Sequence, residues 1–145
     1  MIQKEKKENK RKIWLSWIVW IVVILILSRS MSGEQKVAVT VEADGLSFQT
    51  ESGYTSELKW DDISAIELRE ELSYGTLVEG TDNSKEKSGI WNNEAFGEYE
   101  LIANAKVASC IVCFTESGRI LVFNYESEES TSSLLTAIQE KLVKN

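Results

Sequence analysis

A stretch of sixteen residues without a charged side chain, residues 13–28, constrains this chain more than any other feature of its sequence. As a helix it would be about 24 Å long, which is shorter than the roughly 30 Å hydrocarbon core of a bilayer. Basic side chains flank it, and these can extend to the headgroups while the bilayer thins locally. Three tryptophans lie in its first half, and indole rings favour the membrane interface. The stretch predicts a membrane anchor over residues 13–30, with these residues at the interface: Lys12, Trp14, Trp17 and Arg29.

Two other interpretations of this stretch stay open. A cleaved secretory leader also has a basic start and an apolar middle. Against a leader, the apolar run is long, tryptophan is bulky, and Arg29 between Ser28 and Ser30 makes a poor cleavage site. A core helix of a soluble protein is a weaker alternative, because the stretch has no polar face.

The charges on either side of the stretch predict its orientation. Six Lys or Arg residues precede it, whereas only Arg29 and Lys36 follow closely. Basic flanks stay in the cytoplasm, so we expect residues 1–12 to be a cytoplasmic arm, residues 31–36 a linker and residues 37–145 an extracytoplasmic domain of a single-pass cell-membrane protein. Anchor and leader agree on export of this domain.

The exported part is strongly acidic. Residues 33–145 carry nine basic and twenty-one acidic side chains, a balance of −12, whereas residues 1–32 carry +5. A domain of this charge repels phosphate polymers at long range, so nucleic acid is excluded as a partner. The chain has no histidine, and it therefore lacks both the commonest metal ligand and the side chain that titrates most easily near neutral pH.

Alternating apolar residues and turn signals predict a mainly β domain. The clearest pair is a hairpin in which Val37, Val39 and Val41 alternate before the Asp44-Gly45 turn. Seven strands are expected in all, at about 37–41, 46–50, 54–60, 63–69, 97–102, 107–115 and 119–125. Residues 71–88 show little periodicity and are expected to form a long loop, either functional or a simple connection.

The last stretch changes to a helical period. Leu134, Ile138 and Leu142 recur every four residues with Leu135 beside them, which predicts one apolar helix face. Ser127 or Ser130 can cap its start. Seven strands and one amphipathic helix indicate an α+β fold. Either a strongly bent antiparallel sheet or two orthogonal sheets would leave one end open, and we expect the carboxy-terminal helix to close it.

An ordered series of short motifs resembles the bacterial pleckstrin-homology-like domains. The series is Gly89-Ile90-Trp91, Phe96-Gly97, the strand that ends Val122-Phe123-Asn124 and the upstream segment LKWDDISAIEL. The resemblance covers about residues 37–142. It implies a roll of seven antiparallel strands in two near-orthogonal sheets, capped by the carboxy-terminal helix, often joined to membrane segments and without catalytic residues to carry over. Related eukaryotic domains bind inositol lipids through basic residues near the first hairpin. Here Glu42 and Asp44 occupy that region, so the lipid role is not carried over.

Few side chains suggest chemistry. Cys110 and Cys113 are three apart in a strand, so they point to opposite faces and cannot clamp one metal. Glu98 and Glu100 share a strand face, and such pairs can hold calcium or exchange protons, although a solvated face is the expected role. Asp61-Asp62 could begin a cation site but is expected to be a turn. No catalytic residue, metal site or cofactor is predicted.

The remaining candidates are aromatic. Gly89 and Gly97 with nearby aromatic residues are expected to shape a corner where the sheets meet. The alternative is a recognition surface formed by Trp91, Phe96 and Tyr99. The function predicted from sequence is a membrane-anchored binding module for a protein partner, held in the membrane by residues 13–28. A lipid- or small-ligand-binding module is the alternative, and an enzyme is disfavoured.

Overall fold

The computed structural model describes residues 18, 21 and 37–144. The chain divides into two compact units, Met1–Glu34 and Gln35–Asn145. Ile18 and Ile21 are helical and exposed. The other residues of the expected arm, anchor and linker, including Lys12, Trp14, Trp17 and Arg29, lie outside the described residues. Within the described residues, no helix has the length and apolar character needed to cross a membrane.

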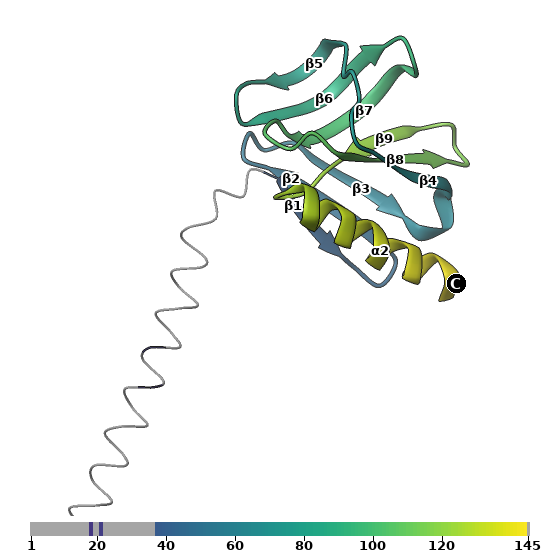
Figure 1. Ribbon diagram of the computed structural model, residues 1–145. Coiled ribbons are helices and arrows are strands. Elements are labelled where there is room, and N and C mark those ends of the chain that lie inside the picture. Colours follow the sequence, from purple (N-terminus) through teal and green to yellow (C-terminus); the bar gives the residue numbers. More distant parts are fainter. Residues whose placement is uncertain (1–17, 19–20, 22–36, 145) are drawn as a thin grey trace, which may run out of the picture. The chain divides into compact units, whose positions relative to one another are not determined.

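The larger unit is mainly β, with two sheets and one carboxy-terminal helix (Figure 1). The smaller sheet has the order β1-β2-β3 and is antiparallel, and the larger sheet has the order β4-β8-β9-β7-β6-β5. The helix is α2 (Glu128–Lys144). The strands are β1 (Val37–Val41), β2 (Gly45–Thr50), β3 (Thr55–Lys59), β4 (Ile63–Arg69), β5 (Thr76–Asp82), β6 (Glu86–Asn93), β7 (Gly97–Asn104), β8 (Cys110–Thr115) and β9 (Ile120–Phe123).

All seven strands expected from the sequence are present, but the expected loop is wrong in its main part. The segment from Thr76 to Asn93 forms the β5–β6 hairpin, which brings the described strands to nine. The antiparallel prediction also needs one correction, because β7 and β9 pair in parallel. The parallel pair arises because β8 and β9 form a hairpin that places β9 beside β7.

A first hydrophobic core lies between the two sheets and α2. Phe48 of the small sheet and Phe123 of the large sheet meet with ring centroids 4.8 Å apart. Ile138 of α2 is fully buried in this core, and Leu134, Leu135 and Leu142 pack against it. The apolar helix face predicted from the sequence is therefore confirmed. The Ser127 hydroxyl accepts a hydrogen bond from the Ser130 N–H at 3.0 Å and caps the helix as expected.

A second core lies on the opposite face of the large sheet. Trp91, Tyr99 and Leu101 belong to it together with Cys110, whereas Cys113 belongs to the first core. The two cysteines thus occupy opposite faces of β8, as the strand period predicts. Tyr99 donates a hydrogen bond of 2.7 Å to the Tyr74 carbonyl, which holds the connection between β4 and β5 to this face.

Candidate functional site

A row of hydroxyl groups joins the small sheet to the large one. We call it the hydroxyl seam; it consists of Thr50, Ser52, Tyr54 and Ser56 on one side and Glu86 and Glu100 on the other. Thr50 and Ser56 share a face of the small sheet, because Ser56 pairs with Phe48, two residues before Thr50. Ser52 and Tyr54 lie in the turn, and their hydrogen bonds to Glu86 and Glu100 direct them to the same side. Each carboxylate receives hydrogen bonds from this row, and the two sheets are fixed to each other there.

Glu86 is the most buried charged group of the seam, with 2% of its surface exposed. Its carboxylate accepts hydrogen bonds from the Ser52 hydroxyl at 2.5 Å, the Ser52 N–H at 3.1 Å and the Ser88 hydroxyl at 2.6 Å. Burial acts to raise the pKa of Glu86, but these hydrogen bonds, with one from Thr50, outweigh it and hold the pKa below its ordinary value. Glu86 is thus an anion stabilised by neutral donors.

Glu100 has a cationic partner, Arg119, in addition to its hydroxyl donors. Its carboxylate forms an ion pair with the Arg119 guanidinium and accepts hydrogen bonds from the Tyr54 hydroxyl at 2.5 Å and the Ser56 hydroxyl at 2.8 Å. Arg119 also donates to the Glu57 carbonyl at 2.7 Å. The expectation of a solvated role for Glu100 is therefore wrong, because Arg119 and the small sheet cover it.

The seam and the cysteines are arranged for stability rather than for proton transfer or nucleophilic attack. Burial, followed by the hydrogen bond and charge of Glu100, raises the pKa of Tyr54 far above its ordinary value. Burial also raises the pKa of the Cys110 thiol to about 11 and that of Cys113 to about 12. These groups stay protonated at neutral pH, whereas an activated nucleophile needs a depressed pKa or an adjacent base.

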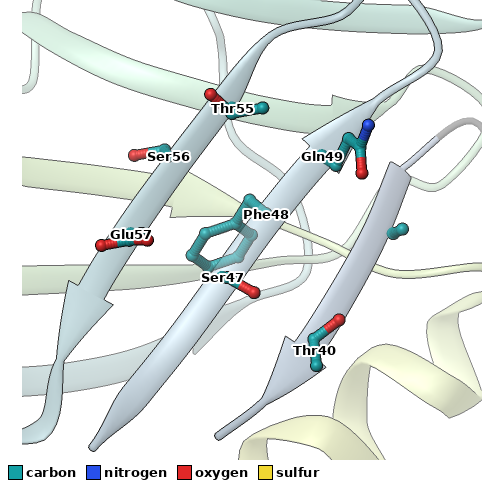
Figure 2. A pocket seen from close by; sticks show the side chains of 8 residues that line it. Thr40, Ser47, Phe48, Gln49, Thr55, Ser56 and Glu57 are labelled. Atoms are coloured by element: carbon teal, nitrogen blue, oxygen red, sulfur yellow. The ribbon is translucent and has the colours of Figure 1, made fainter.

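The outer face of the small sheet carries a hollow of about 610 Å³ (Figure 2). We call it the outer hollow. Its side chains are short and mostly polar because every second residue of the three strands faces away from the core. Two rows of side chains cross the three strands. The first row runs from Thr40 through Ser47 to Glu57, and the second runs from Ala38 through Gln49 to Thr55. The residues that line the hollow are Ala38, Thr40, Ser47, Phe48, Gln49, Thr55, Ser56 and Glu57.

The outer hollow offers hydrogen bonds but little charge. Its lining has four hydroxyl residues, one amide and the single carboxylate of Glu57, and it contains no lysine or arginine. The Ser47 hydroxyl donates to Glu42 at 3.0 Å, which fixes one edge of the hollow. Phe48 and the hydroxyl seam support the sheet from behind. The hollow is thus a polar surface backed by the first core and the hydroxyl seam.

The aromatic residues predicted as a recognition surface do not form one. Trp91 and Tyr99 are only 2% and 3% exposed, and both belong to the second core. Phe96 is partly exposed, packs edge-on against Tyr99 with centroids 5.5 Å apart, and lies under the Arg69 guanidinium at 5.4 Å. These three side chains cannot form a shared accessible surface, because they pack in the second core against the β4–β5 connection.

The other acidic candidates also have structural positions. Asp61 and Asp62 lie in the short 3₁₀ helix Trp60–Asp62, and Asp62 accepts hydrogen bonds from the Ser117 N–H at 3.2 Å and its hydroxyl at 3.0 Å. Glu98 is exposed on the face that it shares with Glu100. The described part of the chain contains no group of His, Cys, Asp or Glu arranged to hold a metal ion.

Sequence reasoning missed both the hydroxyl seam and the outer hollow. The hollow could have been read from the alternate residues of the three strands, which are Ala, Thr, Ser, Gln and Glu rather than lysines. The sequence signal for the seam was weaker and consisted of the alternating hydroxyl residues in TESGYTS. It was weak because the carboxylate partners of these residues are 34 to 46 residues away.

No protein-family model, curated protein or solved structure matches this chain.

Proposed function

We propose that this chain is a single-pass membrane protein whose exported domain is a binding module for a protein partner and carries no catalysis. The observation that supports it best is the outer hollow, a supported polar surface without reactive groups. Short side chains leave room for the side chains of a partner, and their hydroxyl, amide and carboxylate groups offer specific hydrogen bonds.

A protein segment suits the outer hollow better than an anionic ligand does. The lining has one carboxylate and no basic residue, and the domain balance of −12 adds repulsion of anionic headgroups and phosphates. The hollow extends over three adjacent strands, so an extended or helical segment of a partner can contact all of them. Basic or neutral polar segments are therefore favoured.

The proposed location follows from the amino-terminal sequence. Residues 13–30 anchor the chain, residues 1–12 stay in the cytoplasm, and the acidic domain faces outward because basic flanks stay inside. The resemblance to bacterial pleckstrin-homology-like domains supports the same arrangement, a roll of near-orthogonal sheets tethered to a membrane. That family assignment is part of this proposal.

A second candidate function is binding of a neutral small ligand, such as an uncharged lipid headgroup or a sugar. The observation in its favour is the volume of the outer hollow, about 610 Å³, which falls within the range of about 300–1,000 Å³ common for ligand sites. The lining of the hollow has no exposed aromatic side chain, and this weakens the case for a sugar ligand in particular.

The test is site-specific photocrosslinking in native membranes with the full chain. A benzophenone amino acid at Gln49, in the outer hollow, is compared with the same residue at Gln139, an exposed position on α2. We expect a discrete protein adduct from position 49 alone. We also expect Ser47→Arg to remove the adduct by filling the hollow, whereas Ala137→Arg on the helix leaves it intact.

Three results would contradict the protein-partner proposal. Equal adducts from positions 49 and 139 would mean that capture is unspecific. A lipid adduct at position 49 would favour the second candidate. A protein adduct that persists in the Ser47→Arg variant would mean that the hollow does not make the contact.

A further inference from the structure

The two sheets have four edge strands, and three of them are protected against pairing with another chain. In β5 the register shifts between Leu77 and Glu79, and in β4 it shifts between Ile63 and Ala65. Such bulges and charged residues block the addition of a further strand. In β3 the Arg119 guanidinium donates a hydrogen bond to the Glu57 carbonyl, which is then no longer free to pair with another strand. The charged side chains of Glu57 and Lys59 also protect this edge.

The fourth edge, β1, has none of these protections. Its sequence is Val-Ala-Val-Thr-Val, without charge or proline. Its five residues pair with β2 in a register without irregularity, and within the described residues β2 is its only hydrogen-bonded neighbour. A regular, uncharged strand of β-branched residues is the kind of edge that accepts another strand.

We infer that β1 pairs with β1 of a second copy of this chain, antiparallel and centred on Val39. The strand sequence is nearly palindromic, so a twofold axis at Val39 sets Val37 opposite Val41 and Ala38 opposite Thr40 of the second copy. Cross-strand pairs of β-branched residues stabilise an antiparallel ladder. A twofold axis also closes the assembly at two copies.

The exposure of Val41 fits this pairing. Val41 is 42% exposed, while Val37 at the other end of the strand is 2% exposed. In the paired register Val41 of each copy lies beside Val37 of the other, on the side of the sheet that faces the first core. Pairing would therefore cover Val41, the most exposed apolar side chain of β1.

The length of β1 favours the same register. An axis at Val39 pairs all five residues of the strand with β1 of the second copy. An axis at Ala38 or Thr40 would leave two residues of each strand without a partner in β1 of the other copy, so the full ladder selects the alignment at Val39.

Pairing through β1 would also enlarge the outer hollow. Ala38 and Thr40 line the hollow at the β1 side, and in the pair they lie next to Thr40 and Ala38 of the second copy. The two hollows become one face across six strands. The inference does not depend on the proposed function, because the pairing follows from the edges alone.

The test is cysteine crosslinking of the full chain in membranes. Val39→Cys sets two thiols across the axis, where Cα atoms of an antiparallel pair are about 4.5–5.5 Å apart, within disulfide reach. Gln49→Cys on β2 is the control, because its two copies would be about 14 Å apart across three strand spacings. Cys110 and Cys113 are fully buried and give little background. We expect a crosslinked dimer from Val39→Cys alone.

Cysteines at the strand ends test the register separately. Chains with Val37→Cys and chains with Val41→Cys should form a crosslinked dimer when they are produced together, because the axis at Val39 sets these two positions opposite each other, and neither variant should crosslink when it is produced alone. Dimer yields equal for Val39→Cys and Gln49→Cys would overturn the inference. So would a Val37→Cys or Val41→Cys dimer from one variant alone, or a Val39→Cys crosslink to a different protein. Loss of the Gln49 photoadduct with the crosslinked dimer intact would contradict only the proposed function.

Discussion

The Ser52 hydroxyl donates a hydrogen bond of 2.5 Å to Oε2 of Glu86, which lies 34 residues further along the chain. This contact joins the turn after β2 to the first residue of β6. Glu86 is nearly inaccessible, and each of its donors is a hydroxyl or a backbone N–H. The ionised state of one buried carboxylate therefore contributes to the attachment of the small sheet, beside the contacts of Glu100 and the first core.

Acid should weaken the domain through Glu86. Its folded pKa is lowered, so its stabilising effect is present above the unfolded pKa of about 4.3 and is lost as the pH falls through the folded value. Glu86→Gln should lower the free energy of unfolding at pH 7 by about 1–3 kcal/mol and flatten its pH dependence below about pH 5. Urea unfolding of the full chain in detergent at several pH values measures both effects. Exposed Glu98→Gln is the control, and an unchanged acid profile in Glu86→Gln would contradict this role.

The two thiols should react only when the domain opens. Cys110 and Cys113 are fully buried on opposite faces of β8, and burial raises the pKa of each thiol to about 11 and about 12 respectively. Since the thiolate is the reactive form, labelling by an aromatic disulfide at pH 8 should be very slow in the folded chain and complete in denaturant. Fast labelling of even one thiol under native conditions would show that β8 is accessible.

Substitution of Ile138 should separate packing from helix formation. Ile138→Asp places a charge in the first core, where the side chain is fully buried, and should cost more than about 3 kcal/mol. Ala137→Asp changes the exposed neighbour on the same helix and should cost less than about 1 kcal/mol. Thermal unfolding followed by circular dichroism compares the two. Similar midpoints would mean that α2 does not hold the sheets together.

Gly89 and Gly97 should respond differently to alanine, although both have positive φ. A Cβ at Gly89 would lie 2.1 Å from the Glu79 carbonyl oxygen of β5, whereas a Cβ at Gly97 has no neighbour within 4 Å. Gly97→Ala should cost only the backbone strain of about 1 kcal/mol, and Gly89→Ala should cost clearly more because β5 must move. Denaturation midpoints measure the difference. Equal losses of stability in the two variants would mean that β5 can move away from a Cβ at position 89 without an energetic penalty.

The strands that sequence reasoning identified have apolar residues on alternate positions and glycine or aspartate at their ends. The β5–β6 hairpin was missed because three of its features hide that signal. A bulge near Val78 shifts the alternation by one residue. Gly80 pairs with Gly89, so neither shows a side chain, and β6 buries Glu86 and Ser88 where an apolar residue is expected.

The candidate site was harder to predict than the fold. Trp91 and Tyr99 are residue types that often occur in recognition surfaces. Only the path of the β4–β5 connection shows that both side chains are buried in the second core. Glu100 looked solvated because its partner, Arg119, lies in a turn 19 residues away. Pairings at long sequence separation decide burial, and a single sequence gives no direct signal of them.

Labelling of introduced cysteines in intact cells tests the central claim, an outward-facing domain that binds through its outer hollow. Gln49→Cys and Gln139→Cys are treated with a membrane-impermeant maleimide in cells and again as purified full chain. We predict that position 139 reacts at similar rates in both, whereas position 49 reacts more slowly in cells because a partner covers it. Reaction of both positions only after lysis, or equal rates for position 49 in cells and in purified chain, would contradict the account.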